Sequence, residues 1–168
     1  MQNARLPKLI FGVVAAIGAV YFALLYPQLP EVMASHFNAS GVATAWMSKS
    51  TFFLIFPLVM LGASVPVFVL PRTLARRSND KINLPNKEYW LAPERREESL
   101  RFLGIQMGWF GCALLILLFC VLYNAVEANL EPSHRFNSEA FLIELGLFFT
   151  FIAVWMIRML RRFGRITS

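Results

Sequence analysis

The stretch Thr51-Phe-Phe-Leu-Ile-Phe-Pro-Leu-Val-Met-Leu-Gly-Ala-Ser-Val-Pro-Val-Phe-Val-Leu70 carries no charged residue. Three further apolar runs of similar character lie at about 9–26, 102–123 and 140–160. Each run has about 18–22 residues, enough for a helix to cross about 30 Å of hydrocarbon. The chain is 57% hydrophobic and 15% charged, which leaves too little polar sequence for a separate soluble domain. The sequence therefore predicts one transmembrane domain over 1–168, an all-α integral membrane four-helix bundle.

The basic residues indicate the orientation of these four spans. All but Lys49 and Arg135 of the 16 basic residues lie on the side that holds both termini and the loop between the second and third spans. Positive charge stays on the cytoplasmic side of a membrane, so we expect a cytoplasmic N-terminus and C-terminus. The net charge of +6 then reflects orientation and contact with anionic lipid head groups. Nucleic-acid binding is not expected.

The connector between the first two spans, Tyr26–Lys49, is much richer chemically than a simple link requires. Pro30 suits the first turn of a helix and Gly41 suits a helix end, which predicts a short helix lying at the outer membrane interface. Trp46 would anchor the following turn at the interface, and Lys49 would lie among the head groups. We expect this segment to be the part of the protein that meets a ligand.

Neither a metal site nor a catalytic site is expected. The outer loops contain His36 and His134 together with Glu31, Glu127 and Glu131, but their spacing matches no metal-binding motif. Independent histidines that bond to loop backbone explain them more simply. The chain has no GxSxG motif and no glycine-rich phosphate loop, so we expect a protein that is not an enzyme and needs no cofactor.

The cytoplasmic loop between the second and third spans has its own pattern. Asn83 and Pro85 are typical of a turn, and Tyr89 with Trp90 forms an amphipathic patch suited to the interface. Pro93 suits the first position of a helix that continues into the membrane, with Glu94 near its positive end and Arg95 next in the chain. The loop is interpreted as an anchoring elbow, and a docking surface for a cytoplasmic partner is the alternative.

The spans carry several features that allow a functional or a structural interpretation. Glu144 is an intramembrane carboxylate, which indicates function by default. Pro57 and Pro66 predict a bent second span, with a hinge or a cavity between spans as the alternative. Small residues form stripes on the first span (Gly12, Ala15, Ala16, Ala19, Ala23) and the third (Gly104, Gly108, Gly111, Cys112). These stripes predict helix seams, either within the bundle or between subunits.

Two blocks of sequence resemble a known family. Leu29-Pro30, His36-Phe37-Asn38, Gly41, Trp46 and Ser48-Lys49 resemble the signature of an uncharacterised bacterial membrane domain that also forms the N-terminal part of SdpI-like toxin-immunity proteins. Residues 83–99 look like a second block found in stand-alone members. The resemblance implies a multi-pass protein of the bacterial cytoplasmic (inner) membrane. Family members often have Pro and Asp where this chain has Ala43 and Thr44, which weakens an ion site in this loop.

Two functional hypotheses follow. In the first, the protein is non-catalytic and its outer loop binds a peptide, an envelope component or a membrane-protein partner, as in immunity, sensing or an accessory subunit. Its expected binding residues are Pro30, His36, Phe37, Asn38, Gly41, Trp46 and Lys49. In the alternative, the protein is a small transporter or an ion- or proton-linked protein that uses Glu144. The lipid bilayer is a partner in both, and a homo-oligomer is possible.

Overall fold

A computed structural model of the chain describes residues 5–76 and 78–165. It contains four long helices, α1 (Leu6–Leu25), α2 (Lys49–Ala75), α4 (Pro93–Leu130) and α5 (Ser138–Phe163). All four are long and apolar enough to cross a membrane, and each coincides with one of the predicted spans, the first of which ends at Tyr26 in the 3₁₀ turn that follows α1. The prediction of four transmembrane helices is thus confirmed, and the chain is a multi-pass membrane protein.

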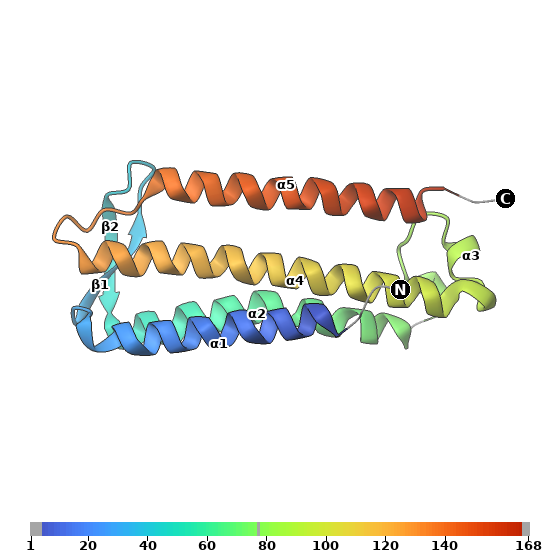
Figure 1. Cartoon of the computed structure of the whole chain (residues 1–168), viewed down its shortest axis with the longest axis horizontal. Helices are drawn as coiled ribbons and strands as arrows, with labels where there is room; N and C mark the ends of the chain where they lie inside the picture. The colour runs from blue at the N-terminus through green and yellow to red at the C-terminus, as the bar shows by residue number, and fades with distance from the viewer. Residues whose placement is uncertain (1–4, 77, 166–168) are drawn as a thin grey trace.

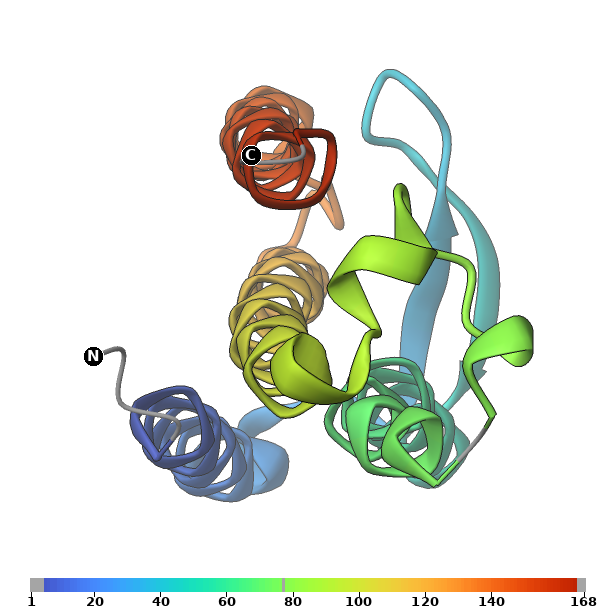
Figure 2. The same cartoon turned by 90° about the vertical axis from the view of Figure 1, so that its right-hand side faces the viewer.

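Helix α4 occupies the centre of the arrangement. Helices α1, α2 and α5 each pack against α4, and α5 lies on the opposite side of α4 from α1 and α2 (Figures 1 and 2). The four helices therefore do not close into the ring of a regular four-helix bundle. Much of the apolar surface of α1, α2 and α5 is exposed, as is expected of helices that face lipid.

The glycines of the third span serve contacts within the chain. A side chain at Gly108 would meet Pro7 of α1, and one at Gly111 would meet Phe68 of α2. On the first span, Gly18 is packed against Phe119 of α4. These small residues let the helix backbones approach closely, as seams inside a membrane protein require. For the third-span stripe, the structure shows the seam within one copy; most of the predicted first-span stripe is exposed, and a side chain at Gly12 would meet nothing, so its use stays a prediction.

The expected short interfacial helix is wrong. Residues Val32–Phe37 form strand β1 and Ala43–Ser48 form strand β2, an antiparallel hairpin that runs across one end of the long helices (Figure 1). Pro30, the predicted helix start, instead lies just before the hairpin, and Gly41, the predicted helix end, lies in its turn. Asn38 Oδ1 accepts hydrogen bonds from the backbone N–H groups of Ser40 and Val42, and Gly41 has a φ of 77°. Such side-chain bonding by asparagine and a left-handed glycine favour a tight turn over a helix.

At the opposite end of the helices, the loop between α2 and α4 forms an elbow around the end of α5. It includes a 3₁₀ turn at Asn79–Lys81 and the short helix α3 (Lys87–Trp90), before α4 begins at Pro93 as predicted. The elbow and the end of α5 share a small apolar core of Ile82, Leu84, Trp90, Leu91, Leu100 and Phe163. Trp90 is buried in this core, so the amphipathic patch expected at the membrane interface does not include it, and the anchoring and docking interpretations of the loop stay predictions. We call this end of the long helices the elbow end, and the opposite end, which carries β1 and β2, the hairpin end.

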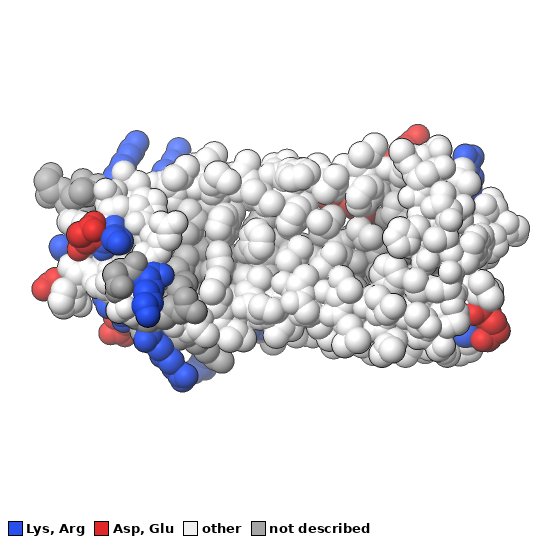
Figure 3. Space-filling model, turned by 180° about the vertical axis from the view of Figure 1, so that it is seen from behind, with Lys and Arg blue, Asp and Glu red and all other residues white. Residues whose placement is uncertain are grey.

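Charged side chains gather at the two ends and leave an apolar band between them. Figure 3 shows more Lys and Arg at the elbow end, where both termini lie, than at the hairpin end. At the hairpin end, the basic residues of the described chain are Lys49 and Arg135. The middle of the surface, which is apolar except for acidic atoms visible in a hollow of Figure 3, is the part that is compatible with the hydrocarbon of a bilayer.

Candidate functional site

The hairpin is held on α4 by one buried amide. Asn129 Oδ1 accepts a hydrogen bond of 2.7 Å from the backbone N–H of Ala34, and its Nδ2 donates to the Ala34 carbonyl at 3.0 Å. The same Nδ2 group donates to the Ala125 carbonyl at 2.8 Å. Ala34 and Asn129 are both buried. The side chain of Asn129 therefore bonds to Ala34 much as a neighbouring strand would, and it fixes the position of β1.

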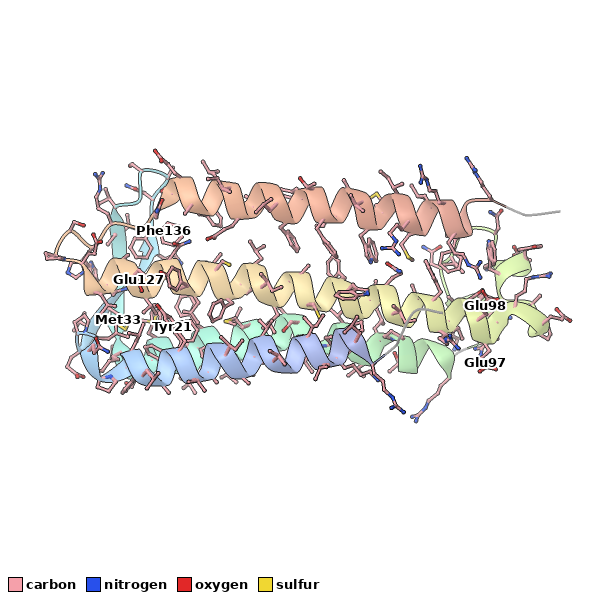
Figure 4. The ribbon with its side chains drawn as sticks, viewed as in Figure 1. Tyr21, Met33, Glu97, Glu98, Glu127 and Phe136 are labelled. Atoms are coloured by element: carbon pink, nitrogen blue, oxygen red, sulfur yellow. The ribbon has the colours of Figure 1, made fainter. Side chains whose placement is uncertain are left out.

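The loop between α4 and α5 closes over the turn of the hairpin. The N–H of Phe136 donates to the Gly41 carbonyl at 2.9 Å, and Val42 and Arg135 form an isolated antiparallel bridge. A side chain at Gly41 would collide with the backbone oxygen of Phe136, so only glycine fits there. The ring of Phe136 lies 5.2 Å from that of Phe37, between α4, α5 and the hairpin (Figure 4).

Lys49 anchors the base of the hairpin. Its ammonium group donates to the Leu29 carbonyl at 3.0 Å, forms an ion pair with Glu31 at 2.8 Å, and lies over the ring of Tyr26. The residue is buried, although lysine is among the residues least often found inside proteins. Its contacts are structural, and they replace the predicted position of Lys49 among lipid head groups.

A cavity of about 480 Å³ opens between the hairpin and the ends of α4 and α5. Its walls are mostly apolar, and a few polar groups lie along the hairpin and at the start of α5. The lining residues are Ser35, His36, Phe37, Asn38, Ala39, Phe56, Val121, Ala125, Phe136, Ser138, Phe141 and Leu142. An apolar pocket with a small number of placed polar groups is the usual form of a ligand site.

The structure brings together only some of the residues predicted to bind a ligand. His36, Phe37 and Asn38 line the cavity, and Gly41 shapes the turn beside it. Trp46 instead lies on β2 with its ring 5.1 Å from that of His134. Two other predicted residues lie outside the cavity lining: Pro30 is exposed just before β1, and Lys49 is buried at the base of the hairpin.

The residues predicted on the cytoplasmic loop form the elbow. Trp90 Nε1 donates to the Phe163 carbonyl at 3.1 Å, and the guanidinium of Arg95 lies 4.0 Å from the centre of the Tyr89 ring. Pro93 is the first residue of α4, and Glu94 lies in its first turn. Asn83 and Pro85 are exposed in the turn that precedes α3. The contacts of this group fasten α5 to the start of α4.

Sequence reasoning missed Asn124 and Asn129 of α4, which organise the hairpin end, and it placed Glu127 in an outer loop, whereas Glu127 also lies in α4. Asn129 holds β1, Asn124 faces α5, and Glu127 accepts a hydrogen bond of 2.7 Å from Tyr21 of α1. Figure 4 shows Tyr21 and Glu127 meeting close to the hairpin. The available signal was the clustering of Asn124, Glu127 and Asn129 in the last turns of an apolar helix. Polar groups at that depth need partners within the protein.

Glu144 lies apart from the cavity, on the α4 side of α5. Asn124 Nδ2 donates to its two carboxyl oxygens at 3.0 and 3.1 Å. The residue is six positions into α5, about 9 Å along the helix axis. It borders a separate space of about 210 Å³ between α4 and α5, lined also by Cys120 and Phe148. Glu144 is therefore paired within the membrane-spanning part of the protein.

The possible cluster of His and Glu side chains at this end does not form. Glu31 pairs with Lys49, Glu127 bonds to Tyr21, and His36 and His134 lie against different surfaces of the hairpin. Across residues 5–76 and 78–165, no three His, Cys, Asp or Glu side chains come close enough to hold a metal ion.

Comparison with known proteins identifies one segment of the chain. No curated protein and no solved structure matches the chain. The matched segment begins in α1, includes the whole hairpin and ends in α2, and it therefore contains His36, Phe37 and Asn38 of the cavity lining. This segment, residues 13–61, is similar to the family described as "Domain of unknown function (DUF1648)".

Proposed function

We propose that the protein is a non-catalytic binding protein whose ligand occupies the cavity beneath the hairpin. The ligand is a peptide, an envelope component or a segment of a membrane-protein partner, with an apolar body and a polar group that reaches His36 or Asn38. The observation that carries this proposal is the cavity of about 480 Å³ lined by His36, Phe37, Asn38 and Ser138 among apolar side chains. Immunity, sensing and an accessory-subunit role are each compatible with a site of this kind.

The construction of the cavity supports a site that is preformed. Asn129 fixes β1 on one side, and the bond from Phe136 to Gly41 fixes the turn on another. A ligand would therefore meet walls that are already in position, which lowers the entropy cost of binding. We further propose that the hairpin end faces the outside of a bacterial inner membrane, with both termini cytoplasmic. The basic side chains at the elbow end support this orientation.

Photo-crosslinking inside native membranes tests the proposed site. A benzophenone amino acid at Leu142, which lines the cavity, should capture one discrete partner. The matched control is Ile143, the next residue, which is exposed and outside the cavity lining. In the Leu142 variant, adding His36→Ala should reduce the captured partner about tenfold, because it removes a polar contact of roughly 1.4 kcal/mol. Asn38→Ala should reduce capture at least as much, because it also removes the bonds that hold the turn beside the cavity.

Each outcome of this experiment bears on the proposal. Similar capture from Leu142 and Ile143, or capture of lipid alone, would remove its basis. Equal capture with and without His36→Ala and Asn38→Ala would show that the polar part of the cavity is not used. Membrane insertion is measured in every variant, so that a loss of protein is not mistaken for a loss of binding.

The pairing of Glu144 with Asn124 supports a second candidate, an ion- or proton-linked transporter. A carboxylate within a membrane span is costly and is retained mainly where protons or cations bind. In reconstituted vesicles, this candidate predicts a pH-dependent flux that Glu144→Gln abolishes. Glu139→Gln, at the exposed start of α5, is the control and should leave the flux within about twofold. A flux that is absent or independent of pH in the wild-type protein would contradict this candidate.

A further inference from the structure

The outer edge of strand β2 has main-chain groups without partners. Ala34 and Trp46 lie directly opposite each other in the hairpin. The N–H and C=O of Ala34 both bond to Asn129, so they point away from β2. In an antiparallel pair, the opposite residue then also directs its N–H and C=O away from its partner strand. Within the described part of the chain, no hydrogen bond engages these two groups of Trp46.

This edge lacks two of the features that normally protect a free strand, charge and proline, although the pairing of the hairpin is irregular between Ala34 and Phe37 and skips Thr44 of β2. Edge strands of monomeric proteins are usually blunted by charged side chains, by proline or by a bulge. Strand β2, Ala-Thr-Ala-Trp-Met-Ser, contains no charge and no proline, and its exposed side chains are those of Thr44, Trp46 and Ser48. The charged residue that follows β2 in the chain, Lys49, is turned inward to Leu29 and Glu31, and Arg135 lies beside Val42 at the other end of the strand. The backbone of the loop between α4 and α5 pairs with Gly41 and Val42, before β2 begins, and the ring of His134 in the same loop lies 5.1 Å from that of Trp46.

We propose that β2 pairs with β2 of a second copy of the chain, which joins the two hairpins into one four-stranded sheet. A two-fold axis beside Trp46 would let each Trp46 N–H donate to the Trp46 carbonyl of the other copy. Antiparallel pairing of one strand with itself is self-complementary, as a symmetric dimer requires. The interface lies on the far side of β2 from β1 and is separate from the cavity of the proposed function.

The placement of the hairpin fits this symmetry in a membrane. Figure 2 looks along the helices and shows the two strands side by side across the view, with β2 on the side away from α4. The two-fold axis of an antiparallel strand pair stands perpendicular to the sheet, and here that direction runs along the helices. Both copies therefore keep the same orientation in the bilayer, and β2 can reach its counterpart without passing α4.

Disulfide trapping in native membranes tests whether the β2 strands of two copies pair with the two Trp46 residues facing each other. The wild-type protein is the background, because Cys112 and Cys120 both lie inside α4. Trp46→Cys should give a covalent dimer, since facing residues that exchange hydrogen bonds have Cα atoms about 5.5 Å apart. Thr44→Cys and Ser48→Cys, carried on differently tagged copies, should crosslink to each other. Each alone should crosslink at least about tenfold less, because identical positions would be about 14 Å apart.

A main-chain test complements the trapping and does not depend on cysteine. Trp46→Pro removes the outward N–H, which the hairpin itself does not use, whereas Trp46→Ala removes the side chain and keeps the N–H. The dimer measured in lipid vesicles should weaken about tenfold or more in the proline variant relative to the alanine variant. The proposal would be overturned if Thr44→Cys and Ser48→Cys crosslinked to each other no better than each variant crosslinks to itself. It would also be overturned if the wild-type protein were a monomer in lipid vesicles, or if Trp46→Pro and Trp46→Ala dimerised equally. Crosslinking of Trp46→Cys to a different polypeptide instead of a second copy would overturn it as well.

Discussion

Replacing Trp90 with alanine is expected to lower the free energy of unfolding by about 3–5 kcal/mol, the usual cost of removing a buried aromatic side chain. Trp90 is only 5% exposed, and its ring packs edge-on against Phe163 at 5.7 Å. Arg162 stacks on the same ring at 4.6 Å. The variant also loses the indole donor to the Phe163 carbonyl, so the last turn of α5 should detach from the elbow.

This change in the free energy of unfolding is measured by titrating the detergent-solubilised protein with a denaturing detergent and monitoring its unfolding. Leu160→Ala is the control, because Leu160 lies on the same end of α5 with 55% of its surface exposed. It should cost less than about 1 kcal/mol. Hydrogen exchange adds a local readout, since the amides of residues 86–91 should lose protection in the Trp90 variant. If the two variants are equally stable, the elbow does not hold α5.

Replacing Asn129 with leucine, which has a similar volume, is expected to cost about 2–5 kcal/mol. The change leaves the buried N–H and C=O of Ala34 without partners, and each such group costs about 1–3 kcal/mol. The hairpin should therefore separate from α4, while the spans remain inserted. The cavity loses one wall when β1 moves, so ligand capture from Leu142 should fall as well.

Hydrogen exchange of the amides of residues 32–37 measures this separation directly. Asn137→Ala is the matched control, because Asn137 caps the start of α5 through a bond to the N–H of Ala140 and is exposed. It should cost about 1 kcal/mol, as loss of a helix cap does, and leave the exchange of β1 unchanged. Unaltered protection of β1 in Asn129→Leu would contradict the strand-like role of this amide.

The long helices were predictable from sequence because the length and polarity of a span are local properties. The prediction placed the four spans at 9–26, 51–70, 102–123 and 140–160, within the helices that the structure contains. The start of α4 at Pro93 was also local, because proline at the first helical position has its own signature. The elbow followed from the turn at Asn83 and Pro85 and from the aromatic pair that comes after it.

The hairpin was not predictable in the same way. Pro30 and Gly41 gave the signals of a helix start and end, and methionine and alanine in β1 are residues that favour helices. The deciding contact is the bond of Ala34 to Asn129, which lies 95 positions further along the chain. A local clue did exist, since Asn38 and Gly41 fit a tight turn between two six-residue segments. The tertiary contact determined which of the two signals prevailed.

The candidate site was predictable only in part for a related reason. His36, Phe37 and Asn38 were marked by their unusual chemistry, whereas Phe136, Ser138 and Leu142 of the opposite wall come from a loop and helix with no such mark. Glu144 was recognised as an intramembrane acid, but its partner Asn124 was not. A single sequence indicates which residues need a partner more readily than it indicates which residue provides one.

The length of α4 makes it a rigid lever across the membrane. Its 38 residues extend about 57 Å, well beyond the hydrocarbon thickness, with no proline after Pro93 that would act as a joint. Asn129 ties one end to the hairpin, and Leu100 packs into the apolar core of the elbow near the other. A tilt of about 10° about its midpoint moves the two ends by about 5 Å in opposite directions. If α4 tilts as one body, a displacement at the hairpin is accompanied by an opposite displacement at the elbow.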